Sequence, residues 1–428
     1  MPTRASIIDV LVLGAGPGAL AIASALGKEN LNVHVLAAND PNDPWPYTYG
    51  IWGDEVDVLG LNHLLQHRWH KTVSYFGHGD TSKNSNENKP TEHSCDYGLF
   101  DKNKLQKHWI TECNNSKVTW HRGIAKDLEI TNKTSSVTTS KGQKITSRLL
   151  IDATGYEPVF LKSPNNGPVA IQTCYGVVGK FTKPPVEKGQ FVLMDYRSDH
   201  LSKEEKGEPP TFLYAMDLGE GRFFLEETSL GLAPAFPIEK LRNRLQERLL
   251  KRGIEITELE HEELGLFLPM NMPIPYMNQP LLGFGGSAAM VHPASGYMVG
   301  SLLRRSPYVA RVIAHKLKDQ EASPASIASE GWKALWPPEL KRKKALYHFG
   351  LEKLMRFKDP QLRAFFQGFF NLPQKQWYGF LTNTLTTSEL VQAMWAMFLE
   401  APWSVRWGLI GMQGKELYLL WKFLKPQN

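Results

Sequence analysis

The sequence has few cysteines, no long apolar run and no block of like charge. Its three cysteines, Cys95, Cys113 and Cys174, are odd in number and lack C-x-x-C spacing, which argues against a disulfide framework or a metal site and favours a reducing compartment. No uninterrupted apolar run reaches about 18 residues, so no simple membrane-spanning helix is expected. The net charge of +6 comes without a Lys/Arg-rich block, so nucleic-acid binding is not expected. Because the first predicted strand begins near Ile7, no signal or transit peptide is expected.

What is present is the composition of an ordinary folded protein. Of the 428 residues, 42% are hydrophobic and 21% are charged, as in typical globular domains. A chain of this length can bury a substantial core and predicts two or three domains. Together with the absences, this composition indicates a protein that is soluble or lies on a membrane surface.

A glycine-rich turn follows the first predicted strand. The apolar run at 7–13 and a second apolar run at 32–38 enclose "GAGPGALAIASALG", which matches G-x-G-x-x-G/A between a strand and a helix. The first glycine permits a tight turn, the second lets the backbone approach a pyrophosphate, and a small third residue lets helix and strand pack closely. A Gly-rich turn without a ligand is the alternative. We predict a dinucleotide site at Gly14, Ala15, Gly16, Pro17, Gly18 and Ala19.

The acidic residue that usually binds the ribose is missing at the end of the second strand. That position, about 20 residues beyond the glycines, holds Ala37 or Ala38, and Asp40 is the nearest carboxylate. Either Asp40 reaches the ribose from a longer turn or the contact is absent.

Two later segments repeat the strand-then-turn pattern. The run "RLLIDATGYEP" at 148–158 places Asp152 and Gly155 after an apolar strand, as in FAD-dependent proteins with two dinucleotide folds. The run at 281–303 is a strand, a glycine turn and a helix, whose backbone N–H groups suit phosphates or a ribityl chain. Three separated signals favour FAD over NAD and predict further cofactor contacts at Gly285, Gly286, Ser287 and Gly296.

The pattern predicts an α/β fold with a Rossmann-like FAD-binding domain, interrupted by an antiparallel sheet. Residues 1–165 and 276–325 form the FAD-binding domain, with a polar surface loop at 77–96. Residues 166–275 form the substrate sheet, and 326–428 form a helical, aromatic-rich region. This last region is interpreted either as a packing layer or as an apolar tunnel mouth and in-plane membrane anchor.

Two adjacent carboxylates stand inside an apolar strand. In "FFLEETS", Glu226 and Glu227 point to opposite faces of the strand, so they are not expected to share one role. Burying an ionised carboxylate costs several kcal/mol unless it is paired. From the residues alone, pairing of both carboxylates with side chains such as Arg222 is favoured.

The chain resembles the plant and cyanobacterial lycopene cyclases over almost its whole length. The resemblance rests on "PWPYTYGIWGDE" (44–55), "MDYR" (194–197), "PTFLYAM" (210–216), "FFLEETSL" (223–230), "GGSAAMVHPASGYMV" (285–299) and "QWYGFLTNTLTTSELV" (376–391). It departs from the family where an Asn before Tyr49 is lost, where Ala37 replaces a common Asp, and at Ser287, where related flavoproteins often have Asp.

The resemblance implies an enzyme that closes β rings at the ends of lycopene and of monocyclic carotenes, without net redox change. It implies reduced FAD, NADPH as the reductant, and peripheral attachment to the cytoplasmic side of a thylakoid or cytoplasmic membrane. The alternatives are ε or mixed ring formation, or a flavin monooxygenase or geranylgeranyl reductase-like enzyme of the same fold. The oligomeric state stays open.

The same resemblance assigns roles to individual side chains. It implies Glu226 as the general acid and Glu227 as its support, because the first position of the E-[E/D]-T motif is the stricter one. The implied substrate pocket holds Tyr49, Trp52 and His292, although His292 could equally be a packing histidine.

Two further pairs of charged residues have a structural interpretation beside a functional one. Asp54 and Glu55 are second-site carboxylates or a solvated turn. Asp195 and Arg197 in "MDYR" are predicted to form an internal ion pair.

Overall fold

The apolar run at the N-terminus forms β1, a central strand of a seven-stranded sheet (the first sheet). The computed structural model describes residues 8–77, 89–264 and 268–425. In the first sheet the order is β8-β2-β1-β11-β10-β9, with β19 beside β11, and β1 pairs in parallel with β2 and β11. Its strands are β1 (Ile8–Leu13), β2 (Val33–Ala37), β8 (Thr119–Arg122), β9 (Ala125–Ile130), β10 (Ser135–Thr139), β11 (Lys144–Asp152) and β19 (Leu282–Gly283).

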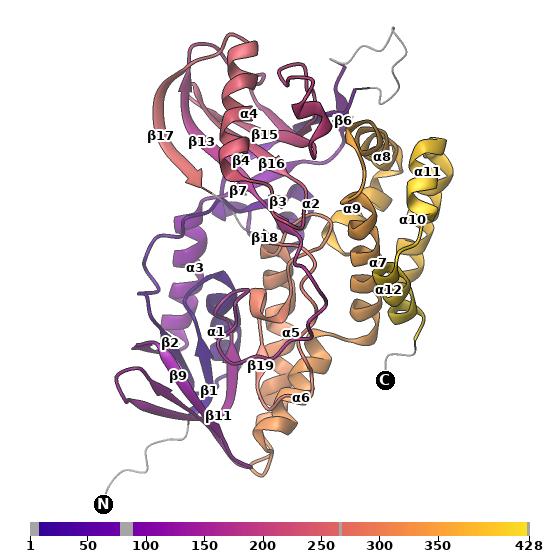
Figure 1. The fold of residues 1–428 in the computed structure, drawn as a ribbon. Helices are drawn as coiled ribbons and strands as arrows, with labels where there is room; N and C mark the ends of the chain where they lie inside the picture. Colours follow the sequence, from indigo (N-terminus) through magenta and orange to yellow (C-terminus); the bar gives the residue numbers. More distant parts are fainter. Residues whose placement is uncertain (1–7, 78–88, 265–267, 426–428) are drawn as a thin grey trace, which may run out of the picture.

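Helices from both ends of the chain cover the first sheet. Helix α1 packs against α3 and α5, and α6 packs against α5 and the β11–β19 edge (Figure 1). Because the central parallel strands are covered in this way, they are buried almost throughout, which explains their apolar sequences. The bounds of these helices are α1 (Pro17–Lys28), α3 (Lys102–Asn115), α5 (Val299–Leu317) and α6 (Pro324–Leu335).

A second seven-stranded sheet forms the upper part of the molecule in Figure 1. Its order is β17-β13-β16-β15-β14-β5-β6, and every pairing is antiparallel except β14 with β5. Helix α4 (Ile238–Lys251) packs on β13 and β16. The strands are β5 (Lys71–Tyr75), β6 (Thr91–His93), β13 (Cys174–Phe181), β14 (Gln190–Asp195), β15 (Thr211–Gly219), β16 (Arg222–Ser229) and β17 (Ile256–Leu264).

The second sheet is not confined to the predicted range 166–275. Strands β5 and β6 come from the segment predicted to belong to the FAD-binding domain, and β6 lies inside the predicted loop at 77–96. Residues 78–88 of that loop lie outside the described residues. The polar composition of this segment hid the strand, because an edge strand of three residues carries almost no periodic signal.

Two small sheets and a short helix join the large ones. The three-stranded sheet has the order β3-β7-β4 and the two-stranded one pairs β12 with β18. Their bounds are β3 (Gly50–Trp52), β4 (Leu65–Trp69), β7 (Tyr97–Phe100), β12 (Ile171–Gln172) and β18 (Leu268–Pro269), and helix α2 (Gly53–Leu59) follows β3.

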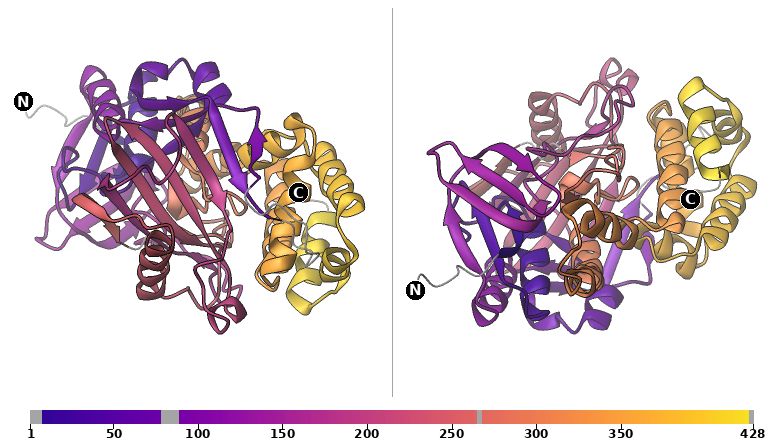
Figure 2. Two further views of the ribbon diagram at one scale, coloured as in Figure 1. Left: turned by 90° about the horizontal axis from the view of Figure 1, so that it is seen from above. Right: turned by 90° about the horizontal axis from the view of Figure 1, so that it is seen from below.

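Residues 338–424 form a layer of helices beside α5 and the second sheet, as Figures 1 and 2 show. Apolar side chains of α8 and α9 pack with those of the second sheet in one buried cluster. In the described ranges, no helix combines the length and apolarity needed to cross a bilayer. The helices are α7 (Pro338–Leu354), α8 (Asp359–Asn371), α9 (Gln374–Thr382), α10 (Thr387–Glu400), α11 (Trp403–Ile410) and α12 (Gly414–Leu424).

Candidate active site

The three glycine-rich turns predicted from the sequence meet at the end of β1. A Cβ atom placed on Gly14, whose φ is +111°, would lie 2.6 Å from a carbonyl oxygen of the turn after β11. A Cβ on Gly18 would lie 3.3 Å from the Cα of Gly285, and one on Gly286 would lie 2.9 Å from the carbonyl carbon of Gly155. The backbones therefore approach one another at distances that only glycine permits.

The start of α1 leaves backbone donors available beside this meeting point. Gly16 is the N-cap and Pro17 the first helical residue, and no side chain caps the helix within the described residues. A Cβ on Gly16 would have no atom within 4 Å, so the space in front of the turn is open. Unpaired N–H groups and the helix dipole at this point suit a pyrophosphate. Ala15 and the buried Ala19 complete the turn.

Asp152 and Ser287 hold the turns together by internal hydrogen bonds. The carboxylate of Asp152 accepts from the backbone N–H of Phe160 at 3.0 Å and from the hydroxyl of Thr154 at 2.7 Å. The hydroxyl of Ser287 donates to the carbonyl of Gly155 at 2.7 Å. Both side chains lie at the predicted place, with these oxygens engaged by the protein itself.

Two predicted cofactor contacts lie apart from the glycine turns. Asp40 is exposed, three residues beyond the end of β2, and accepts a hydrogen bond from the backbone N–H of Asn42 at 2.9 Å. The neighbours of Gly296 are Leu268 and Gln172, which a Cβ on that glycine would meet at 2.7 and 2.9 Å.

Glu227 faces α4 and is fully buried in an ion pair. Nε of Arg248 lies 2.9 Å from its Oε2, and Nη2 of Arg248 donates to its Oε1 at 2.9 Å. The hydroxyl of Thr211 donates a third bond at 2.6 Å. The partner is not Arg222, which pairs instead with Glu260 on β17. The prediction that Glu227 pairs with a residue such as Arg222 is therefore wrong about the partner. The partner comes from α4, which only the tertiary fold brings over β16.

Glu226 points to the opposite face of the second sheet and is only partly buried. The hydroxyl of Thr228 donates to its Oε1 at 2.7 Å. Burial raises the pKa of Glu226, and the hydrogen bonds from Thr228 and Cys174 lower it by less. In register, Glu226 lies between Tyr214 on β15 and Gly176 on β13. A raised pKa favours the protonated form of the carboxyl group.

A second carboxyl group, Glu263, shares this face and was not predicted. Gly176 pairs with Glu226 on one side and with Glu263 of β17 on the other, and the ring of Phe224 lies over this glycine, 2.9 Å from where a Cβ would stand. Burial, followed by the charge of Glu226, raises the pKa of Glu263 to about 8. Its Oε2 accepts a hydrogen bond from Thr48 at 3.4 Å, and its Oε1 is buried without a hydrogen-bond partner among the described residues.

Nothing local in the sequence indicates this role for Glu263. The run "ITELEHEEL" alternates charged residues as a solvent-facing strand would. Only the pairing of β17 with β13 brings one of these carboxyl groups to the buried face. Gly176 is equally unremarkable in the sequence until both of its neighbours are known.

An aromatic cluster lies on the same face as Glu226. The rings of Trp52 and Tyr97 meet edge to face with centroids 5.2 Å apart, and Tyr97 stacks on Phe191 at 4.2 Å. The hydroxyl of Tyr214 donates to that of Tyr97 at 3.0 Å. Tyr297 comes from the loop before α5, and its ring centroid lies 6.1 Å from that of Tyr97. Such π faces stabilise a cation in a dry site.

The other predicted pocket residues divide between two places. Tyr49 contacts Trp45 edge to face at 5.5 Å, and burial followed by nearby charges that include Glu263 raises its pKa. His292 lies against Tyr347, with ring centroids 4.4 Å apart, in a neighbouring pocket lined by α5, α7, the end of α9 and Tyr297.

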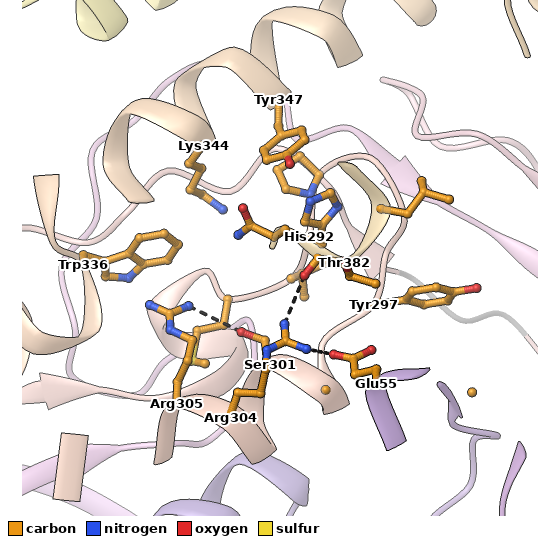
Figure 3. A pocket seen from close by; sticks show the side chains of 17 residues that line it. Glu55, His292, Tyr297, Ser301, Arg304, Arg305, Trp336, Lys344, Tyr347 and Thr382 are labelled. Atoms are coloured by element: carbon orange, nitrogen blue, oxygen red, sulfur yellow. Dashed lines mark hydrogen bonds and ion pairs between the residues drawn. The ribbon is translucent and has the colours of Figure 1, made fainter. Parts of the chain in front are cut away.

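The remaining carboxylates have structural partners. Asp54 is exposed, and Glu55 pairs with Arg304 of α5 (Figure 3). The predicted internal pair is present, since Asp195 is buried and its Oδ2 lies 2.6 Å from Nη2 of Arg197. Oδ2 of Asp195 also lies 2.9 Å from Nη2 of Arg252.

Solved structures of flavoproteins share this fold. A geranylgeranyl bacteriochlorophyll reductase-like protein from Thermoplasma acidophilum aligns with a TM-score of 0.65 at 16% identity, over 94% of this chain and 99% of that one. A halogenase solved in complex with FAD aligns with a TM-score of 0.61 at 10% identity, over 91% and 85%. At these identities the likeness establishes the fold alone.

Sequence comparisons establish the family. The chain is 50% identical over 417 residues to "Lycopene beta cyclase" of Synechococcus elongatus, covering 97% of this chain and 99% of that protein. It is 31% identical over 408 residues to the chloroplastic/chromoplastic "Lycopene beta cyclase" of Capsicum annuum, covering 94% and 79%. The family model described as "Lycopene cyclase protein" matches residues 9–407. The chain belongs to the lycopene cyclase family.

Proposed function

We propose that this chain converts the ends of lycopene into β rings, giving first a monocyclic carotene and then β-carotene. The observation that carries the proposal is a protonatable carboxyl group, Glu226, on the same sheet face as a buried aromatic cluster. Identity of 50% to a protein named lycopene beta cyclase supports β rather than ε rings.

The substrate dictates the chemistry of the site. Lycopene is a hydrocarbon with no polar handle, so its pocket must be apolar and its activation must come from a proton. Protonation at C2 of the terminal double bond generates a carbocation that closes the ring, and loss of a proton from C6 gives the β ring. One proton is gained and one is lost, so the reaction is an isomerisation.

Glu226 is assigned as the general acid that protonates C2. Burial favours its neutral form, and Glu263 beside it disfavours ionisation of both carboxyl groups together. The proton released from C6 returns to this carboxyl pair, which restores the starting proton count. Tyr97, Tyr214 and Trp52 present aromatic faces that stabilise the cation while the ring closes.

Glu227 is assigned a positioning role on the other face of the sheet. Its bidentate bonds to Arg248 tie β16 to α4, and this fixes the strand that carries Glu226. Both of its oxygens are held by Arg248, so its contacts separate its role from that of Glu226.

FAD is the cofactor that the first sheet fits. Gly16 leaves open space in front of the backbone donors at the start of α1 for a pyrophosphate, and Gly14, Gly18 and Gly286 let the three turns pack closely around it. Reduced FAD, with NADPH as its reductant, would supply a fixed negative charge beside the substrate. The protein itself orients the substrate, excludes water and carries the proton.

The outer surface of the C-terminal helices is assigned to membrane contact. More than half of the large apolar side chains that are exposed in the described residues lie beyond residue 390. They include Trp395, Trp403, Trp407 and Trp421, with Lys415 and Lys422 among them. Tryptophan and lysine together are typical of the boundary between headgroups and acyl chains, and lycopene must arrive from lipid.

The proposal is tested by expressing the chain in bacteria that accumulate lycopene and separating their pigments by HPLC. We expect β-carotene with some monocyclic intermediate. Unchanged lycopene despite soluble, FAD-loaded protein would refute the proposed function, and ε-ring products would refute the regiochemistry alone.

A further inference from the structure

A second polar pocket lies between the first sheet's helix α5 and the C-terminal helices (Figure 3). Its walls come from the loop before α5, from α5 itself, from α7 and from the end of α9. Neither Glu226 nor Glu263 lines it, and neither do the glycines of the three cofactor turns. Tyr297 of the aromatic cluster also lines it, so the pocket adjoins the candidate active site without including its carboxyl groups.

Cations dominate the lining of this pocket. Arg304, Arg305 and Lys344 all line it, whereas Glu55 is the single carboxylate among its described lining residues. Figure 3 shows Glu55 engaged by Arg304, whose other contact is the carbonyl of Thr382 at 3.0 Å. Arg305 and Lys344 are thus left without an acidic partner inside the pocket.

The two unpaired cations are held in place by neutral groups. Lys344 donates to the carbonyl of Ala289 at 2.7 Å, and Arg305 donates to the carbonyl of Leu335. Both lie over the ring of Trp336, at 5.3 Å for Lys344 and 4.8 Å for Arg305. These bonds use only part of the three donors of lysine and the five of arginine, so donors remain for a ligand.

Burial and mutual repulsion destabilise the charged forms of these groups. Desolvation, followed by the charge of Arg305, lowers the pKa of Lys344 to about 7. Desolvation, followed by the charge of Arg304, lowers the pKa of Arg305 to about 9. A buried charge without compensation is costly, and a bound anion would supply the missing charge.

His292 adds a donor to the same wall. Its Nδ1 accepts hydrogen bonds from the backbone N–H groups of Ala294 and Ser295, each at 3.2 Å, which places the ring proton on Nε2. That Nε2–H is buried and has no partner among the described residues. Since the residue lines the pocket, an acceptor there would satisfy it.

We propose that this pocket binds a small oxyanion, a phosphate group, through Arg305, Lys344 and His292. The cavity volume of about 40 Å³ has room for about three waters or one such group, and it is too small for a whole nucleotide. Because α5, α7 and α9 all contribute, the anion ties the helical layer to the first sheet. The group is either free phosphate or the terminal phosphate of a larger molecule, such as the 2′-phosphate of NADPH.

The test uses the FAD-loaded full chain and inorganic phosphate at constant ionic strength. Calorimetric titration should give a Kd of about 1 mM or lower, and phosphate should raise the unfolding temperature above that in chloride. Lys344→Gln should weaken binding by about 10-fold or more, which is about 1.4 kcal/mol. Lys107→Gln, an exposed lysine on α3, is the matched control and should bind like the unmodified chain.

Three outcomes would overturn the proposal. The first is that the unmodified chain binds no phosphate, a result that does not depend on the folding of any variant. The second is that Lys344→Gln binds phosphate as tightly as the unmodified chain. The third is that phosphate binds only to protein stripped of FAD. If NADPH displaces phosphate and NADH does not, the phosphate belongs to the nucleotide; if neither displaces it, the ligand is free phosphate. None of these measurements depends on cyclase activity. The phosphate-binding proposal and the proposed function can therefore be refuted separately.

Discussion

Glu226 and Glu227 are neighbours in the chain, but they lie in environments of opposite electrostatic character. Glu227 is paired with a guanidinium group, whereas Glu226 shares its face with aromatic rings and a second carboxyl group. The alternation of a β-strand creates this difference over a single residue. The two side chains should therefore respond differently to the same substitution.

We expect Glu226→Gln to lower cyclisation by about 100-fold or more, because an amide cannot deliver the proton that starts the reaction. FAD content and unfolding temperature should stay close to those of the unmodified chain. The measurement is product formation by HPLC with lycopene in vesicles. Glu258→Gln, on the exposed edge of β17, is the matched control and should remain active. Full activity of Glu226→Gln would rule out its assignment as the acid.

We expect Glu227→Gln to lower the free energy of unfolding by about 3 kcal/mol, because Arg248 is then buried without its counter-charge. Urea unfolding measures the loss. Replacing both partners, as Glu227→Gln with Arg248→Met, should recover part of the stability. An unchanged urea midpoint in the single variant would contradict the positioning role.

The glycines of the elements around the cofactor site differ in how much free space a Cβ atom would find at each of them. Gly14, Gly18 and Gly286 are packed against backbone, so a side chain there strains the fold, whereas Gly16 faces open space. A side chain at Gly16 would therefore occupy the ligand's place and leave the protein's own packing intact.

We accordingly expect Gly16→Val to reduce bound flavin by about 10-fold or more, because its side chain enters the space assigned to the pyrophosphate. The unfolding temperature of the cofactor-free form should hardly change. Flavin absorbance per chain gives the first quantity, and circular dichroism gives the second. Normal flavin content would place the pyrophosphate elsewhere.

The outer helices α10, α11 and α12 carry their apolar side chains outward, a pattern that packing against the protein cannot explain. We expect the triple change of Trp403, Trp407 and Trp421 to Ser to weaken vesicle binding by about 100-fold, since each tryptophan contributes roughly 1 kcal/mol on insertion. A flotation assay measures the partition. The exposed Tyr276 and Tyr308, changed together to Ser, form the control. Equal flotation of both variants would exclude this face.

Across the whole molecule, the buried carboxyl pair should make stability depend on pH. The pKa of Glu263 is about 8 in the folded chain against 4.5 for the free side chain, so the folded state keeps a proton that the unfolded state releases. Raising the pH from about 4.5 to 8 therefore favours unfolding, by a few kcal/mol at most.

The measurement compares urea midpoints at about pH 5 and pH 8. We expect Glu263→Gln to lose less stability than the unmodified chain over this interval, because the amide does not titrate. Parallel losses in the two proteins would show that Glu263 does not hold its proton.

Sequence alone determined the features that depend on neighbours along the chain. The turn at Gly14–Ala19 follows from a strand, small residues and a helix in succession, and the separation of Glu226 from Glu227 follows from strand alternation. The α/β class with an inserted antiparallel sheet and terminal helices is confirmed by the structure and by its fold relatives. The turn and the strand alternation depend on contacts within about a dozen residues, where periodicity is a direct signal, and the fold class was inferred from the order of such local elements.

The tertiary structure alone decided which distant groups meet. Arg248 became the partner of Glu227 because α4 crosses β16, and Glu263 joined Glu226 because β17 pairs with β13 across Gly176. Asp152 was shown to bind its own turn, and Ser287 was shown to bind that same turn after β11. These outcomes depend on the register and packing of segments tens of residues apart, which no local pattern encodes, and the raised pKa values of Glu226 and Glu263 follow from that packing.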